Sequence, residues 1–307
     1  MITACGMDIG TNSFRLLVAE VENGRLRPLL QDLVTVRLGE GLWASGLLAP
    51  AAMLRGEAAL ARFLEKMAPY PLHCVRACAT HAVRKGANSQ DFLRRAEALT
   101  GLSIEVLSGE EEARLALLGV LSALPEEQLQ APLLLADVGG GSTELILQAA
   151  AGSEPRLISL PLGAVGLSEE FGADRESMGE KIRAALTPAL RSLGEENQAG
   201  QGLSLVASGG TATSLAALAL GLDRYDARQV QNYPLHQPTL HRLLAWLAAL
   251  SPAERNALPG LADGRGEIIV AGAVILQELQ QALGSSPLLV SDAGLLEGIL
   301  LSGATGC

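Results

Sequence analysis

One short pattern occurs twice in this chain and constrains its fold more than any other feature. Residues 8–13 read Asp-Ile-Gly-Thr-Asn-Ser, and residues 137–142 read Asp-Val-Gly-Gly-Gly-Ser. Both copies have the form Asp-aliphatic-Gly-x-x-Ser, and each lies between two apolar segments that are typical of strands. Glycine supplies the backbone freedom that a tight connection between strands needs. Two hairpins opened by the same loop predict a duplicated α/β unit.

Strand and helix patterns alternate through the rest of the chain. After residues 2–8 and 14–19, the turn Asn23-Gly24 predicts a third strand at 26–33. Ser108 and Glu111 have capping-box spacing and open a helix that is expected to reach about residue 124. Further helices are expected at 50–67, 89–100, 178–193, 268–283 and from 293 onward, and further strands at 74–79, 104–107, 133–137, 143–147, 203–207 and 288–290. Residues 125–132 are expected to connect two domains, and residues 194–202 to form a polar loop.

The composition indicates a folded, acidic protein. Hydrophobic residues make up 49% of the chain and charged residues 18%, which suffices for a sizeable core. The net charge is −10 and aromatic residues are only 3%, which argues against nucleic-acid and anionic-membrane partners. Only three of the 23 cationic residues are lysines, so 20 are arginines. Arginine suits phosphate contacts, although a GC-rich genome produces the same bias.

The sequence favours a cytoplasmic location. The chain reaches Asp8 too early for a signal peptide. Its longest uncharged stretch, residues 202–222, is interrupted by Ser-Gly-Gly-Thr and is a poor membrane span. The four cysteines fit no zinc-site spacing and are interpreted as reduced thiols.

The two Asp-Gly loops are candidate anion sites. Successive N–H groups in a glycine-rich turn form a nest for an anion, although each loop alone is equally an ordinary hairpin. Two such loops facing each other across a cleft would hold a phosphate chain. Asp137 and Glu144 flank the second loop and as a pair suit Mg²⁺. The alternative for Glu144 is a solvent-facing strand residue.

Other charged residues have two interpretations each. Glu110, Glu111 and Glu112 lie in the first turn of a predicted helix, where acids interact favourably with the helix dipole. The functional alternative is that one of them orients a water molecule. Arg84, at the start of an expected loop, is either solvated or binds phosphate. The four histidines show no metal spacing, and the chain has no Walker A loop, dinucleotide fingerprint or nucleophile elbow.

At these residues the chain resembles the exopolyphosphatase/guanosine pentaphosphate phosphohydrolase (Ppx/GppA) family over nearly its whole length. The motifs that carry the resemblance are residues 8–15, 79–84 with Asn88 and Phe92, 108–114, 137–145, 208–212 and 291–295. The family places its catalytic glutamate directly before an Ala-Arg pair, which selects Glu112.

The resemblance implies an α/β fold of the actin/hexokinase type, with two ribonuclease-H-like domains and an active site in the cleft between them. The domains would be residues 1–124, joined by a helix at 293–307, and residues 125–292. It further implies Mg²⁺ or Mn²⁺, exo-acting release of terminal phosphate from polyphosphate or guanosine pentaphosphate, a homodimer, and a short form without additional C-terminal domains.

The resemblance also implies residue roles. Glu112 and Arg84 would be catalytic, and Asp8, Asp137 and Glu144 would hold the metal. The residues expected to bind substrate phosphates are Gly10, Thr11, Asn12, Ser13, Arg15, Gly139, Gly140, Gly141, Ser142, Gly209, Gly210 and Thr211.

Two departures from the family pattern bear on substrate binding. Gly166 and Leu296 stand where the family often has arginine, which weakens the expectation for long polyphosphate more than that for the chemistry. Two alternatives remain: an ATP-dependent kinase of the same fold, and a non-catalytic sensor of these anions.

Overall fold

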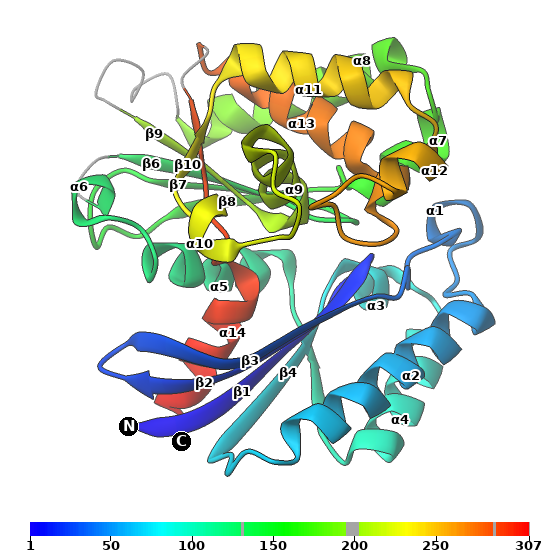
Figure 1. Cartoon of the computed structure of the whole chain (residues 1–307), viewed down its shortest axis with the longest axis vertical. Helices are drawn as coiled ribbons and strands as arrows, with labels where there is room; N and C mark the ends of the chain where they lie inside the picture. Colours follow the sequence, from blue (N-terminus) through cyan, green and yellow to red (C-terminus); the bar gives the residue numbers. More distant parts are fainter. Residues whose placement is uncertain (130–131, 195–202, 285–286, 307) are drawn as a thin grey trace. The chain divides into compact units, whose positions relative to one another are not determined.

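The chain folds into two compact units. The structure, a computed structural model, describes residues 1–129, 132–194, 203–284 and 287–306 (Figure 1). The first unit comprises Met1–Ser122 and Gly294–Cys307, and the second comprises Ala123–Ala293. Most of the loop expected at 194–202, and part of the connection expected at 125–132, lie outside the described residues.

The first unit is built on a five-stranded sheet in the order β3-β2-β1-β4-β5. Its elements are β1 (Ile2–Ile9), β2 (Ser13–Glu22), β3 (Arg25–Thr35), α1 (Leu42–Ser45), α2 (Pro50–Met67), β4 (Cys74–Ala79), α3 (His81–Lys85), α4 (Ser89–Thr100), β5 (Ile104–Val106), α5 (Gly109–Leu121) and α14 (Leu295–Thr305). The first three strands form an antiparallel meander, and β4 and β5 run parallel to β1. Asn23 and Gly24 both have positive φ, as the predicted hairpin turn requires.

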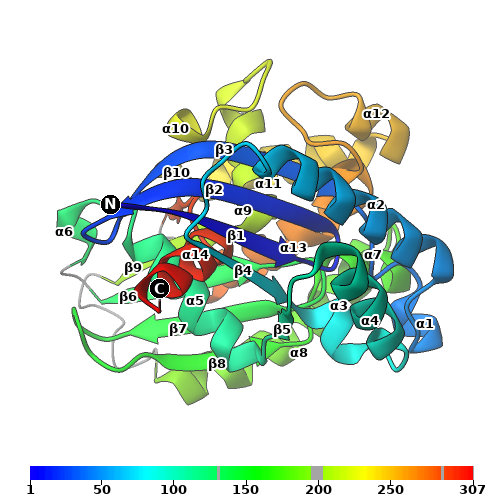
Figure 2. The same ribbon diagram turned by 90° about the horizontal axis from the view of Figure 1, so that it is seen from below.

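Helices cover both faces of this sheet (Figure 2). Alternate residues of β1 and β2 pack against α2 and α4 on one face, where Phe14, Phe63 and Phe92 are fully buried. On the other face, Ala4 and Leu17 pack against Leu296 and Leu300 of α14. A Cβ on Gly298 would lie 1.9 Å from the carbonyl oxygen of Leu115, so glycine permits the close contact between α14 and α5.

The second unit repeats this architecture. Its sheet has the order β10-β11-β9-β6-β7-β8, in which β8-β7-β6-β9-β11 corresponds to β3-β2-β1-β4-β5. Its elements are α6 (Glu126–Leu129), β6 (Leu133–Val138), β7 (Thr143–Gln148), β8 (Arg156–Leu160), α7 (Ala164–Phe171), α8 (Arg175–Leu193), β9 (Ser204–Ser208), α9 (Gly209–Leu220), α10 (Ala227–Val230), β10 (Tyr233–Leu235), α11 (Gln237–Ala249), α12 (Pro252–Asn256), a 3₁₀ turn η2 (Arg265–Glu267), α13 (Ile269–Ala282) and β11 (Leu288–Val290). The duplicated α/β unit predicted from the repeated loop is therefore confirmed.

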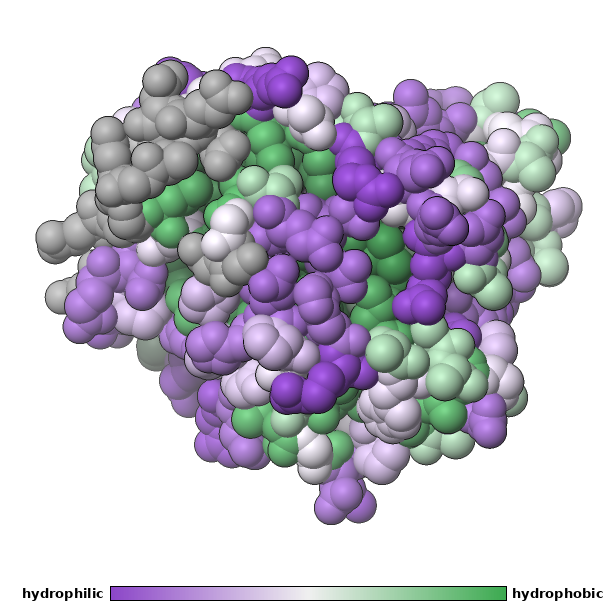
Figure 3. Space-filling view, turned by 90° about the horizontal axis from the view of Figure 1, so that it is seen from above, coloured by the Kyte–Doolittle hydropathy of each residue, from purple (hydrophilic) through white to green (hydrophobic). Residues whose placement is uncertain are grey.

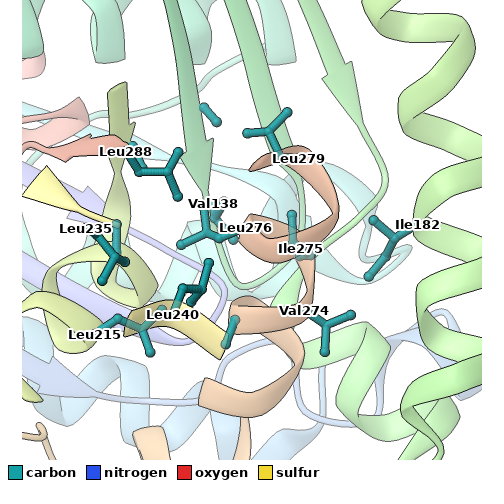
Figure 4. Packing of buried hydrophobic residues seen from close by; sticks show 14 of the residues in the cluster. Val138, Ile182, Leu215, Leu235, Leu240, Val274, Ile275, Leu276, Leu279 and Leu288 are labelled. Atoms are coloured by element: carbon teal, nitrogen blue, oxygen red, sulfur yellow. The ribbon is translucent and has the colours of Figure 1, made fainter. Parts of the chain in front are cut away.

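The core of the second unit gathers around α13. Figure 4 shows Val274, Ile275 and Leu279 of this helix among side chains from the strands and from α8, α9 and α11. Nearly every residue of α13 is buried, because the helix packs between its neighbours and the sheet. This explains the long apolar pattern that the sequence shows at 268–283.

Several elements differ from the sequence-based expectation. Arg84 lies in the short helix α3, not at the start of a loop. The patterns in the sequence did not predict the elements β8, α7, α10, β10, α11 and α12. The strand β8 alternates weakly and is half exposed, so its pattern is masked by polar residues.

The surface in the space-filling view is mixed: hydrophilic residues cover much of the visible face, and hydrophobic ones form smaller separate areas (Figure 3). Within the described residues, none of the helices combines the length and the apolar character that a membrane crossing requires. Cys5 and Cys78 are free and buried, as expected, but Cys74 is disulfide-bonded, so the expectation of four reduced thiols is wrong for this residue.

Candidate active site

The carboxyl ends of three parallel strands meet at one edge of the first sheet. Strand β1 ends beside β4, where the N–H of Thr80 donates to the Ile9 oxygen at 3.3 Å. Strand β4 ends beside β5, where the N–H of Leu107 donates to the Ala79 oxygen at 2.9 Å. The loop after β1, helix α3 after β4 and helix α5 after β5 therefore start together. This edge is where open α/β sheets bind ligands.

The loop at residues 10–13 offers donors to an anion. The Thr11 oxygen accepts from Gly39 at 2.9 Å, and the Asn12 oxygen accepts from Val36 and Arg37 at 3.0 and 2.7 Å. The loop carbonyls are thus occupied by the following segment. The N–H groups of Thr11 and Asn12 donate to no other residue in the described part of the chain. Two open N–H groups in a turn are the donors that a phosphate group uses.

Asp8 stands at the base of this loop, directly opposite Arg15 on β2. The guanidinium of Arg15 donates twice to Asp8 Oδ2, from Nε at 2.9 Å and from Nη2 at 2.7 Å. Asp8 Oδ1 and Thr11 Oγ1 are buried and have no hydrogen-bond partner among the described residues. Buried polar atoms without partners are costly, so a bound group or water is expected beside them.

The three consecutive glutamates of α5 have different partners. Glu110 forms an exposed i,i+4 ion pair with Arg114 at 3.0 Å. Glu111 completes the capping box that was predicted, accepting from the Ser108 N–H at 2.8 Å. Glu112 is buried, and its Oε2 accepts from Arg84 Nη1 at 2.9 Å. Glu110 is therefore solvated, Glu111 caps the helix, and Glu112 pairs with Arg84 of α3.

Two acceptors fix the guanidinium of Arg84 through Nη1, and its other nitrogen atoms remain available as donors to a ligand. Its Nη1 donates to the Leu107 oxygen at 2.6 Å and to Glu112. The Nε and Nη2 groups make no hydrogen bond within the described residues. A guanidinium oriented in this way can give its remaining fork to a phosphate oxygen pair.

His81 lies one turn before Arg84 and is buried beneath Trp43. Burial, reinforced by the neighbouring charges of Arg84 and Lys85, lowers the pKa of His81 to about 4. The imidazole is therefore neutral at neutral pH. The histidines show no metal spacing in the sequence, and the burial of His81 agrees with a structural interpretation.

Acid should destabilise the first unit through His81. Its pKa is about 6.5 in the unfolded chain and about 4 in the folded one, so between these values the unfolded state binds more protons. The free energy of unfolding should therefore be about 3 kcal/mol higher above pH 6.5 than at pH 4. This difference is lost as the pH falls through the range between the two pKa values. Urea unfolding from pH 4 to 8 should show this slope, and His81→Gln should flatten it. The exposed His241→Gln should keep the wild-type slope.

The second unit carries the same kind of loop. The Gly139 oxygen accepts from Ala164 at 3.0 Å, and the Gly140 oxygen accepts from Val165 at 2.9 Å. The N–H groups of Gly140 and Gly141 donate to no residue in the described ranges. A Cβ on Gly163 would lie 2.3–2.4 Å from the backbone of Gly140 and Gly141, so the glycines allow this close approach. The repeated sequence pattern thus corresponds to a repeated arrangement of carbonyl and N–H groups.

A row of polar residues crosses the second sheet at the base of this loop. Ser208, Asp137, Glu144 and Ser159 are register neighbours on β9, β6, β7 and β8, so their side chains share one face. Ser159 donates to Glu144 Oε1 at 2.8 Å, and Glu144 is 1% exposed. The solvent-facing alternative for Glu144 is therefore excluded. In the first unit, the position that corresponds to Glu144 is Arg15.

Two opposed acids are unfavourable unless a cation or a proton lies nearby. Asp137 and Glu144 supply hard oxygen donors, and the neighbouring Ser208 Oγ is buried without a partner among the described residues. The described residues hold no cluster of three or more His, Cys, Asp and Glu suited to a metal. Mg²⁺, however, commonly uses one or two carboxylates with water and substrate phosphate. The pair therefore fits Mg²⁺, whereas Asp8 is already neutralised by Arg15.

Arg265 lies beside the loop at residues 208–210, which the sequence did not predict. Ser208 is followed by Gly209, with φ of 87°, and by Gly210. A Cβ on Gly210 would lie 1.8 Å from Arg265 Nη2, so the guanidinium rests directly on this glycine. The only signal in the sequence is an arginine between glycines at 264–266, which does not indicate proximity to residues 208–210.

The predicted site residues thus form one group in each unit. The first group contains Asp8, Gly10, Thr11, Asn12, Ser13, Arg15, Arg84 and Glu112, and the second contains Asp137, Gly139, Gly140, Gly141, Ser142, Glu144, Gly209, Gly210 and Thr211.

Comparison with known proteins places this arrangement in a family. The sequence profile of the Ppx/GppA phosphatase family matches residues 17–305. The chain belongs to the Ppx/GppA phosphatase family. The matched range includes the loop at residues 137–142, where the N–H groups of Gly140 and Gly141 donate to no described residue, and it begins after the loop at 8–13.

Individual Ppx/GppA relatives match along nearly the whole chain. Exopolyphosphatase 2 of Mycobacterium tuberculosis is 33% identical over 319 aligned positions, which cover 96% of this chain and 97% of that protein. The crystal structure of an exopolyphosphatase-like protein has a TM-score of 0.91 at 28% identity and covers 99% of this chain and 98% of its own. The Aquifex aeolicus Ppx/GppA family member has a TM-score of 0.78 at 28% identity, with the same coverage. These structures confirm the actin/hexokinase type of fold.

Proposed function

We propose that this protein hydrolyses the terminal phosphoanhydride bond of inorganic polyphosphate and of guanosine pentaphosphate, with Mg²⁺. The observation that carries the proposal is the buried ion pair of Glu112 and Arg84, which lies at the sheet edge where the open N–H groups of residues 11 and 12 also lie. The names of the relatives, exopolyphosphatases among them, support the same reaction class.

The reaction follows from the roles that these side chains can take. The Nε and Nη2 groups of Arg84, which make no hydrogen bond with a described residue, hold the terminal phosphoryl group, while its Nη1 keeps the Glu112 carboxylate in one orientation. Glu112 accepts a proton from water as the water oxygen bonds to phosphorus. The bridging P–O bond breaks, and the shortened chain leaves with the electron pair. Phosphoryl transfer passes through a loose transition state, so positioning and charge neutralisation dominate.

Each loop can bind phosphate oxygens that do not react. Thr11 and Asn12 donate from the first unit, and Gly140 and Gly141 donate from the second. Asp137 and Glu144 would hold Mg²⁺, which when bound would neutralise phosphate charge and polarise the phosphoryl group.

Two alternatives are distinguished by one assay. A kinase of the same fold would require ATP and an acceptor, and a sensor would bind without turnover. We expect phosphate release from polyphosphate with Mg²⁺ and without ATP. A strict requirement for ATP, or tight binding of polyphosphate without phosphate release, would contradict the proposed hydrolysis.

Short substrates should be used at least as well as long ones. A long polyanion gains affinity from many cation contacts, each of which releases counterions. This chain has a net charge of −10. Gly166 and Leu296, where related proteins often carry arginine, are buried, and Leu296 packs against Ala4 and Leu17. We therefore expect distributive action with a shallow salt dependence.

The measurement is kcat/KM across a polyphosphate length series, with product lengths followed on a gel. Intermediates should accumulate, and kcat/KM should level off at short length. Processive digestion, with affinity rising steeply with length, would reveal a basic track elsewhere on the surface.

A further inference from the structure

An aromatic pair adjoins the phosphate loop of the first unit and has no role in the hydrolysis described above. Trp43, in the short helix α1, stacks on His81 with ring centroids 5.8 Å apart and an interplanar angle of 11°. His81 is buried, whereas Trp43 is 37% exposed. One face of the indole therefore lies on the imidazole, and the exposed part of the ring is open to a ligand.

Only one residue separates this ring from the phosphate loop. The N–H of Gly39 donates to the Thr11 oxygen at 2.9 Å. A Cβ on Gly39 would lie 2.4 Å from Thr11 Cγ2 and 3.5 Å from Trp43 Cζ3. Gly39 is thus packed between Thr11 and the indole, and a side chain there would push them apart. On its other side the aromatic pair connects to the catalytic group, because His81 and Arg84 lie one turn apart in α3.

The backbone around Trp43 holds the ring in place. Gly41 and Gly46, both with φ of 70°, flank α1, and Leu42 is buried below it. The side-chain oxygen of Asn88 accepts from the Leu48 N–H at 2.8 Å, which anchors the segment that follows. An exposed tryptophan on an anchored turn loses little conformational freedom on binding a flat ligand.

The chemistry of an indole beside a phosphate loop indicates a nucleotide. Purine bases stack on aromatic side chains, and the N–H groups of Thr11 and Asn12 are available to the attached phosphates. We propose that Trp43, supported by His81, is a stacking platform for the purine base of a nucleoside 5′-polyphosphate whose phosphates occupy the loop at residues 10–13. This assignment rests on the proposed function and specifies its substrate class. Because the His81 imidazole is neutral, it supports the indole without adding a third positive charge beside Arg84 and Lys85.

The platform predicts a difference between substrates with and without a base. Calorimetry in the presence of Mg²⁺ would give Kd for guanosine 5′-(β,γ-imido)triphosphate and for inorganic imidodiphosphate, neither of which needs to be hydrolysed. Trp43→Ala should weaken the nucleotide by about 5- to 100-fold, the usual effect of removing one stacked aromatic ring. It should leave the Kd of imidodiphosphate unchanged, which also shows that the loop remains folded. Trp43→Phe should retain part of the nucleotide affinity.

Trp246→Ala is the matched control, because Trp246 is also exposed but lies on α11 in the second unit. It should change neither Kd. An unchanged ratio of the two Kd values in Trp43→Ala would overturn the platform. A protein that binds the nucleotide through Trp43 but releases no phosphate from any substrate would instead contradict the proposed hydrolysis and leave the platform standing.

Discussion

Glu112→Gln is expected to lower kcat by about 10²- to 10⁴-fold, the usual range for a positioned acid or base. Glutamine keeps the shape of the side chain and one acceptor for Arg84, but it cannot take a proton from water. KM should change little, because the lost interaction acts in the transition state. Steady-state phosphate release from tripolyphosphate gives both constants.

The neighbouring glutamates provide matched controls for this change. Glu110→Gln removes only an exposed ion pair with Arg114 and should leave kcat within about twofold. Glu111→Gln keeps the capping box, because the glutamine oxygen can still accept from the Ser108 N–H, and it should leave kcat nearly unchanged. Near-normal turnover in Glu112→Gln, or an equal loss in Glu110→Gln, would remove Glu112 from the proposed mechanism.

The double variant Asp137→Asn, Glu144→Gln should abolish Mg²⁺-dependent activity while the protein stays folded. Both changes are isosteric, and the amide oxygen introduced by Glu144→Gln can still accept from Ser159. Because both changes keep the volume of the buried side chains, the variant should still unfold in one cooperative transition in EDTA. The rise in Tm that Mg²⁺ produces in the wild type should disappear. Thermal unfolding with and without Mg²⁺ measures both effects.

The variant Asp8→Asn tests the third acid that the family resemblance assigns to the metal, apart from Asp137 and Glu144. Its carboxylate is paired with Arg15 in a nearly buried ion pair, so this change should lower stability and keep the Mg²⁺-induced rise in Tm. An unaltered Mg²⁺ response in the double variant, or its loss in Asp8→Asn, would show that the metal is held elsewhere.

The duplicated loops have diverged at one decisive position. In each copy the residue seven places after the aspartate lies directly opposite it on the next strand. In the first unit this residue is Arg15, which pairs with Asp8, and in the second it is Glu144, which places a second carboxyl group opposite Asp137. The same backbone therefore carries a neutral pair in one unit and a candidate cation site in the other.

The sequence alone was sufficient for the features that local physics specifies. The repeated loops, the Asn23-Gly24 turn and the capping box of Ser108 and Glu111 depend on residues close together in the chain. Strand and helix periodicity likewise predicted most elements, although the helix of Arg84, the strands β8 and β10 and several helices of the second unit were missed. The resemblance added the fold type, which the comparisons confirm.

The contacts between segments that are far apart in the chain could not be predicted from the sequence and are seen only in the folded structure. The family pattern selects Glu112 among three adjacent glutamates, but only the meeting of α3 with α5 shows that its carboxylate pairs with Arg84. Arg265 reaches Gly210, and Trp43 covers His81, across about 40 to 55 residues of chain. Such contacts are set by how strands pair and helices pack, and the side chains that meet there leave no periodic signal in the sequence. The pairing of side chains in the candidate site therefore follows from strand order and packing, whereas its loops could be predicted from the sequence.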